Sequence, residues 1–144
     1  MTALEALLGT YHLSFWGLWL ILFTVLVQST IATIAHRKQA KYIPGLLDER
    51  LGHGSFVFRS HRTFHNSLEN TLLMFAPALL AIIVGVDPTW LAIWVWLYAV
   101  ARIIHMVLYY AIATERNPSP RSYFFMLGFV CNIAVFVLVA MRLL

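Results

Sequence analysis

Three long stretches of this chain contain no charged side chain, and they constrain its fold more than any other feature. Residues 6–36, 70–86 and 122–141 contain no Asp, Glu, Lys or Arg. A helix needs about 20 apolar residues to cross the hydrocarbon of a bilayer, so the first and third stretches are long enough alone. The second becomes long enough when its helix extends back through residues 60–68, with the polar groups of that segment near one interface. The pattern predicts a polytopic membrane protein.

The stretch over residues 88–113 is also long and apolar enough to span, although it carries Arg102 and His105. Of the 144 residues, 61% are hydrophobic and only 11% are charged, as expected when most of a chain faces lipid. We therefore predict an all-α fold, an integral membrane four-helix bundle in a single membrane domain over residues 1–144. The expected helices lie near residues 10–36, 60–85, 89–113 and 122–143, and one long loop covers residues 37–59.

Basic residues are concentrated in two connections, before the second expected helix and before the fourth. They are Arg37, Lys38, Lys41, Arg50, Arg59, Arg116 and Arg121. The segment before the first helix and the turn at residues 85–89 contain no Lys or Arg. By the positive-inside rule both basic loops are cytoplasmic, and both termini lie on the opposite side of the membrane. Because these charges flank membrane helices, we expect no nucleic-acid binding despite the net charge of +4.

Cysteine and histidine usage excludes two kinds of site. Cys131 is the single cysteine, which excludes an intrachain disulfide and a cysteine-clustered metal site. The histidines are scattered without a ligand pair backed by carboxylates, so we predict no metal. The first apolar run follows no basic segment and far exceeds the hydrophobic region of a signal peptide, so we expect no cleaved signal.

Glu69 lies in an apolar segment and shares one helical face with three other polar residues. Arg62, His65 and Asn66 precede it at spacings that place all four within an arc of about 100° on a helix. Placing ionisable groups inside membrane segments costs free energy, and such groups usually face a bundle interior or a water-filled cavity. We therefore expect this face to mark function.

The third expected helix carries a second polar stripe. Tyr98, Arg102, His105 and Tyr109 fall within an arc of about 60°. We expect the two stripes to face each other, with Glu69 paired to Arg102 or Arg62. An ion pair that merely fixes helix register is the alternative for Glu69 and Arg102, but the additional donors and acceptors favour a polar ligand site. Because arginines outnumber carboxylates, the site suits a small zwitterionic anion.

These polar residues also match the motifs of a known family. The run from Arg59 to Asn70 resembles the R-x-x-R-x-x-x-N-x-x-E signature of the MAPEG family, the membrane-associated proteins in eicosanoid and glutathione metabolism. The segment from Ala101 to Tyr109 looks like its R-x-x-H-x-x-x-Y motif, and Arg121-Ser122 stands where the family places a catalytic arginine and serine. The resemblance covers the chain from residue 52 to its end and is weaker before that.

The resemblance implies a homotrimer that binds glutathione as co-substrate between neighbouring subunits, on the cytoplasmic side of a bacterial inner membrane or an ER-type membrane. The residues carried over to the glutathione pocket are Arg62, His65, Asn66, Glu69, Arg102, His105 and Tyr109. Arg121 is implied to stabilise the thiolate, with Ser122 beside it. Arg37 or Lys38 is the nearest counterpart of a first-helix arginine that reaches the glutathione of the neighbouring subunit.

Departures from the family pattern bear on the activity. Phe64 and His65 occupy places where prostaglandin-synthase-like members have a histidine and an arginine, which argues against that assignment. The resemblance therefore implies a glutathione transferase or peroxidase acting on lipophilic electrophiles or lipid hydroperoxides. The alternative is a non-catalytic lipid-binding or scaffold member of the same fold. A small transporter is disfavoured, because broken helices and an inverted repeat are lacking.

Overall fold

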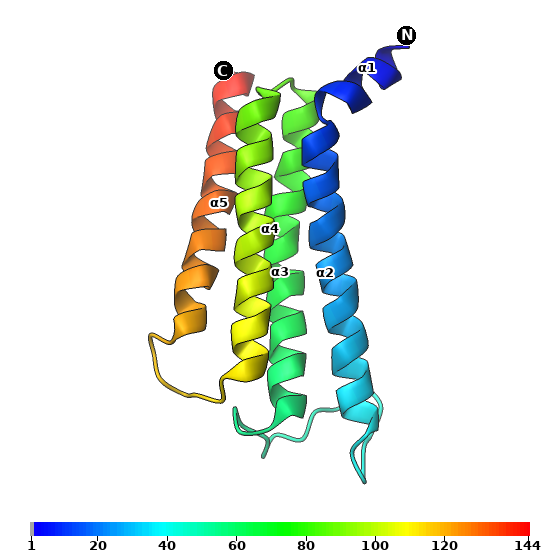
Figure 1. Ribbon diagram of the computed structural model, residues 1–144, viewed down its shortest axis with the longest axis vertical. Coiled ribbons are helices and arrows are strands. Elements are labelled where there is room, and N and C mark those ends of the chain that lie inside the picture. Colours follow the sequence, from blue (N-terminus) through cyan, green and yellow to red (C-terminus); the bar gives the residue numbers. More distant parts are fainter. Residues whose placement is uncertain (1) are drawn as a thin grey trace.

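The computed structural model describes residues 2–144 and contains five α-helices. They are α1 (Ala3–Thr10), α2 (His12–Arg37), α3 (Phe56–Ile83), α4 (Pro88–Ala111) and α5 (Pro120–Leu143). Figure 1 shows α2 to α5 lying side by side along one axis, with α1 turned outward at the end where both termini lie. Residues 2–144 contain no named strand, so the predicted all-α fold is confirmed.

The four long helices are each long and apolar enough to cross a membrane, and the chain is an integral membrane protein. The four predicted spans are confirmed, with bounds that shift by a few residues. The largest shift is in α3, which begins at Phe56 rather than near residue 60. Ser55, the residue before it, has an extended backbone conformation and is the N-cap of the helix. The long loop therefore covers residues 38–55.

The short helix α1 lies outside the predicted elements. The hydroxyl of Thr2 accepts a hydrogen bond from the Glu5 backbone N–H at 3.2 Å, and the Glu5 carboxylate accepts one from the Thr2 N–H at 2.7 Å. This reciprocal capping box satisfies two backbone donors that a helix start otherwise leaves unpaired. A helix of 8 residues is too short to show a clear hydrophobic period, so its cap is its main signal in the sequence.

The turn at residues 84–87 reverses the chain between α3 and α4. Gly85 has a φ of +74°, a left-handed conformation that ends a helix at little cost only with glycine. Asp87 then caps α4 by accepting hydrogen bonds from the backbone N–H groups of Thr89 and Trp90 at 3.0 and 3.1 Å. This turn and both termini lie at one end of the bundle, the terminal end (Figure 1). The loops at residues 38–55 and 112–119 lie at the other, the basic end.

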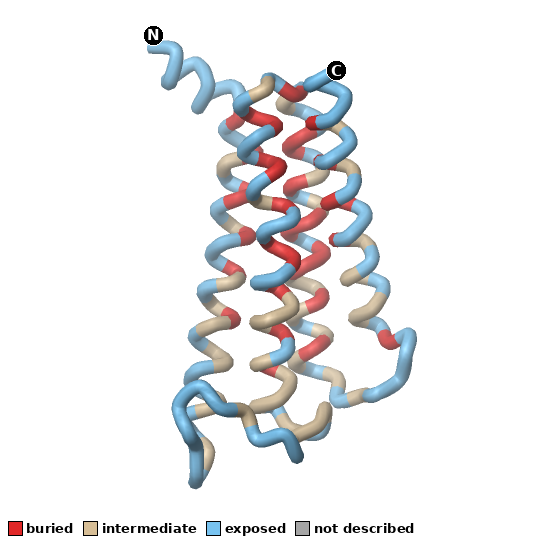
Figure 2. The backbone as a smooth tube through the Cα atoms, turned by 180° about the vertical axis from the view of Figure 1, so that it is seen from behind, coloured by how far each residue is buried: buried red, intermediate tan, exposed pale blue. Residues whose placement is uncertain are grey.

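The apolar core occupies the half of the bundle toward the terminal end. Its fully buried members include Met74, Ala78, Leu91, Val95, Cys131 and Val135. A Cβ on Gly17 would lie 2.6 Å from Cγ1 of Val95, so glycine is what allows α2 to approach α4 there. Figure 2 shows the buried residues on the inner faces of the helices and exposed residues on the loops of the basic end. Tyr98 of the α4 stripe belongs to this core, and the other residues of the two polar stripes lie beyond it, toward the basic end.

Candidate functional site

A cleft of about 410 Å³ opens at the basic end, between α3, α4, the start of α5 and the loop before it. We call it the first cleft. Its lining residues are Asn66, His105, Asn117, Pro118, Arg121, Ser122, Phe125 and Met126. Four of these residues belong to the predicted site, namely Asn66, His105, Arg121 and Ser122. Phe125 and Met126 make part of the wall apolar, and the Met126 side chain is exposed.

Arg121 lies in the first turn of α5 and is held from two directions. Its guanidinium carbon lies 4.1 Å from the centre of the Tyr109 ring, a cation–π contact. Its Nη2 donates a hydrogen bond to the Thr114 carbonyl at 2.9 Å, and its Nη1 donates to the Ile112 carbonyl at 3.5 Å. These contacts hold a positive charge at the wall of the first cleft, next to the helix start, where the dipole of α5 also favours an anion.

Ser122 follows Arg121 and helps to begin α5. Its Oγ accepts a hydrogen bond from the Ser119 backbone N–H at 3.1 Å and lies 3.2 Å from the Ser119 hydroxyl. This capping contact fixes the position of the Ser122 hydroxyl at the wall of the first cleft.

Arg102 joins the two polar stripes. The residue is 3% exposed, and its Nη2 donates hydrogen bonds to Asn66 Oδ1 and Ser67 Oγ, both at 2.8 Å. The stripes of α3 and α4 therefore face each other, as the spacing predicts. The partners of the buried charge are an amide and a hydroxyl, so α3 orients the guanidinium without neutralising it.

The predicted ion pair of Glu69 with Arg102 or Arg62 is wrong within this chain. Among residues 2–144 the structure contains one ion pair, which joins Asp48 and Arg50 in the long loop. Glu69 and Arg62 are both exposed, because they lie on the part of the α3 stripe that faces away from α4. The stripe covers a wide arc, and only its Asn66 side contacts Arg102.

His105 and Tyr109 lie on α4, and both are buried behind Arg121. Their ring centroids lie 5.6 Å apart, and the His105 ring lies 6.4 Å from that of Phe125. Nδ1 of His105 and Nε of Arg102 are buried and have no hydrogen-bond partner among residues 2–144. Buried polar groups normally have a partner, so these two atoms mark an unusually polar interior behind the first cleft.

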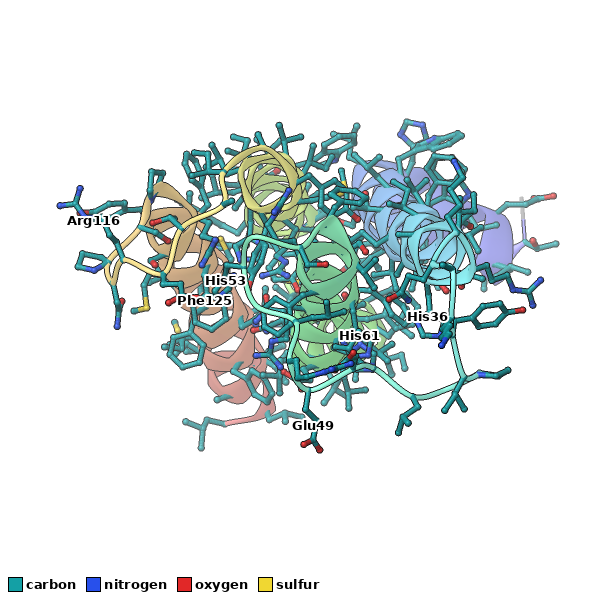
Figure 3. All side chains as sticks on the ribbon, turned by 90° about the horizontal axis from the view of Figure 1, so that it is seen from below. His36, Glu49, His53, His61, Arg116 and Phe125 are labelled. Carbon is teal, nitrogen blue, oxygen red and sulfur yellow. The ribbon has the colours of Figure 1, made fainter. Side chains whose placement is uncertain are left out.

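Two predicted site residues lie elsewhere. Arg37 and His65 line a second cleft of about 400 Å³ between the end of α2, the long loop and α3. His36 and His61 line it too, and the rings of His61 and His65 stack with centroids 4.0 Å apart. In Figure 3, seen from the basic end, His36 and His61 lie on the α2–α3 side of the bundle, and Phe125 lies on the α5 side. One chain therefore does not bring all the predicted residues to one pocket.

His53 is a site neighbour that the sequence motifs do not include. Its ring lies 5.8 Å from that of Tyr109, and its carbonyl accepts a hydrogen bond of 2.6 Å from Arg59. In the view of Figure 3 it lies between α3 and α5. Burial lowers the pKa of His53 from its ordinary value, and the nearby positive charge of Arg121 lowers it further. The one signal for it in the sequence is an imidazole between two glycines, Gly52 and Gly54, in a long loop.

The described chain offers no metal centre: residues 2–144 contain no group of three His, Cys, Asp or Glu side chains that could hold an ion. Comparison with protein-family models matches residues 13–141, nearly the whole chain, to the MAPEG family. No curated protein and no solved structure matches the chain.

Proposed function

Because this chain belongs to the MAPEG family, whose members are membrane proteins of glutathione and eicosanoid metabolism, we propose that it is a membrane-bound glutathione transferase or peroxidase. The co-substrate supplies a thiolate that attacks a lipophilic electrophile or reduces a lipid hydroperoxide. The observation that carries this proposal is the position of Arg121. Its guanidinium is held over Tyr109 in a cleft that also contains Asn66, His105 and Ser122.

Arg121 is the group that favours the thiolate over the thiol. A free thiol has a pKa near 8.5 and is only a few per cent ionised at neutral pH. Lowering that pKa by about two units requires about 2.7 kcal/mol of preference for the anion. A half-buried guanidinium held by two carbonyls and an aromatic ring, at a helix N-terminus, can supply this preference. The Ser122 hydroxyl adds a donor beside it.

The chemistry of the first cleft fits glutathione. Asn66 and His105 line this cleft and can hydrogen-bond to its peptide and carboxylate groups, and Arg102 supports Asn66 from behind. The apolar wall of Phe125 and Met126 gives the second substrate a route from the lipid to the thiolate. A polar co-substrate and a lipophilic acceptor can thus meet at one place.

A second subunit supplies the remaining residues in this proposal. Glu69 is exposed about 20 Å along α3 from its start at the basic end, where a charge against lipid is costly. Glu69 and Arg62 are therefore expected to be covered by another copy of the chain, in a homotrimer as the family resemblance implies. The second cleft of the neighbouring subunit, with its Arg37, can then lie next to the first cleft of this subunit. Glu69 can accept hydrogen bonds from the ammonium group of glutathione.

The basic end faces the cytoplasm in this arrangement, because both basic loops lie there. A variant with Glu49→Cys in the exposed loop, in sealed inside-out membrane vesicles, should react with a membrane-impermeant thiol reagent. Labelling of the same variant only from the opposite face would reverse the orientation.

The central test replaces Arg121 by Ala and follows glutathione conjugation to an aryl halide. We expect the rate to fall by about 100-fold or more, the usual cost of removing a group that stabilises developing negative charge. The thiol pKa of bound glutathione, read from thiolate absorbance, should rise toward about 8.5. Arg116→Ala, a change at an exposed loop arginine, is the matched control and should leave both quantities unchanged.

The same titration separates the enzyme from its alternative, a non-catalytic lipid-binding or scaffold protein. A scaffold protein would not ionise the thiol of glutathione, whether or not it binds glutathione. Undiminished turnover and a normal thiolate signal in the Arg121→Ala variant would remove Arg121 from the mechanism.

A further inference from the structure

The helix α1 carries a narrow apolar stripe that touches little of the bundle. Leu4, Leu7 and Leu8 are 63%, 38% and 47% exposed, and their spacing places them within an arc of about 100°. Ala6 and Gly9 lie on the opposite side of the same helix, and Glu5 lies beside the edge of the stripe. A leucine stripe on one side of a helix, with a carboxylate at its edge, is typical of a helix that lies at a boundary between water and hydrocarbon.

The position of α1 along the bundle is fixed by its junction with α2. The Tyr11 hydroxyl donates a hydrogen bond of 2.6 Å to the carbonyl of Val86, so this junction lies level with the turn before α4. Asp87 caps α4 at that level, and Arg142 donates to the Val84 carbonyl at 3.1 Å. These charged groups mark the membrane–water boundary at the terminal end. From this level α1 turns away from the bundle axis (Figure 1).

An apolar cleft lies in the angle between α1 and α2. It has a volume of about 560 Å³, and its lining residues are Leu8, His12, Phe15, Trp16 and Trp19. The rings of Trp16 and Trp19 lie 5.7 Å apart, and Trp19 stacks on Phe23 at 5.0 Å. Exposed tryptophans at one level of a membrane protein favour the headgroup region of a bilayer.

We propose that α1 is an interfacial helix that lies along the bilayer surface at the terminal end and buries its leucine stripe among acyl chains of bilayer phospholipid. The apolar angle between α1 and α2 holds one such chain. The stretch from residue 2 to residue 36 contains no Lys or Arg, so binding depends on apolar burial and not on anionic headgroups. A zwitterionic phosphatidylcholine bilayer is therefore a sufficient partner.

Spin-label accessibility tests the proposal on the full chain. In a Cys131→Ala background, nitroxide labels are placed at residues 4, 7 and 8 on the stripe and at residues 6 and 9 opposite it. The protein is reconstituted in phosphatidylcholine bilayers. We expect labels on the stripe to be more accessible to oxygen than to a water-soluble nickel complex, as at the exposed lipid-facing reference Ile133. Labels opposite the stripe should behave as a label at the loop reference Glu49 does.

Two outcomes overturn the proposal. If all five labels behave as the loop reference does, α1 projects into water. If the stripe labels are shielded from both reagents and broadened by neighbouring labels, a second copy of the chain covers the stripe.

The cleft itself has a separate test. Leu8→Asp places a charge in the apolar angle and should make labels at residues 4 and 7 water-accessible, whereas Gly9→Asp, where no atom lies within 4 Å of an added Cβ, should not. Equal effects of the two changes would show that the cleft holds no acyl chain. Adding phosphatidylglycerol should leave the accessibility pattern unchanged, and a pattern that appears only with the anionic lipid would contradict apolar burial as its cause.

Discussion

At the scale of single residues, Arg102 is a buried charge held by neutral partners. Replacing Asn66 by Ala removes one of its two acceptors on α3, Asn66 Oδ1, and leaves Ser67 Oγ as the other. We expect a loss of about 1.5–3 kcal/mol in the free energy of unfolding, the range for hydrogen bonds to charged groups, measured by denaturant titration in detergent. Asn70→Ala is the matched control, because Asn70 donates to a backbone carbonyl within α3 at 2.8 Å. Equal losses for the two variants would contradict a special role of Asn66.

His53 makes stability depend on pH. Burial and the charges of Arg121, Arg62 and Arg59 lower its pKa below the ordinary 6.5, while Glu115 opposes them. The unfolded chain therefore binds the proton at a higher pH than the folded chain does. This contribution to stability is complete above pH 6.5 and is lost as the pH falls below it. The melting temperature should drop less between pH 7 and pH 5 in His53→Gln than in the unsubstituted protein, and equal drops would contradict this assignment.

At the scale of elements, the approach of α2 to α4 depends on one glycine. Gly17→Ala places a Cβ 2.6 Å from a side chain that is completely buried, Val95. We expect a loss of about 1–3 kcal/mol, typical of overpacking, measured by the same titration. Adding Val95→Ala should recover part of the loss. Gly9→Ala on α1, with no neighbouring atom within 4 Å, should not lower stability, and a loss as large as that at Gly17 would argue against the close approach.

The long helices could be predicted from the sequence because lipid imposes one requirement on the whole length of a span. Residues 6–36 and 122–141 lack charges throughout, so the bounds of α2 and α5 follow within a few residues. The start of α3 could not be placed as well, because residues 56–59 precede its polar stripe and resemble a loop end. The short α1 escaped prediction because its stability comes from a local cap and not from a long period.

The candidate site was predictable in composition but not in arrangement. Helical spacing correctly places Asn66 opposite Arg102. It does not tell which edge of an arc faces the neighbouring helix, so Glu69 is exposed instead of paired. Spacing also cannot reveal that Arg37 and His65 line a different cleft from Arg121, because that depends on how four helices pack. His53 reaches the site from a loop, where no period exists.

At the scale of the whole molecule, the separation of the two clefts predicts that a site shared between subunits can be rebuilt from two defective chains. In the proposed homotrimer each site takes Arg121 from one subunit and Arg37 from its neighbour. Arg37→Ala and Arg121→Ala should then each be nearly inactive as pure trimers. A mixed trimer always contains one junction where an intact Arg121 meets an intact Arg37, so it should keep one working site.

Co-expression of the two variants in equal amounts therefore tests both the assembly and the site. Random mixing makes three of every four trimers mixed, and conjugation activity per trimer should reach about a quarter of the unsubstituted level. Mixing the two variants after separate purification is the control, because assembled trimers should not exchange subunits and should stay inactive. If co-expressed chains are as inactive as the pure variants, while native mass spectrometry finds mixed trimers, each subunit builds its site alone. Arg37 and Arg121 would then both act within one subunit, and the neighbour's second cleft would have no part in the site.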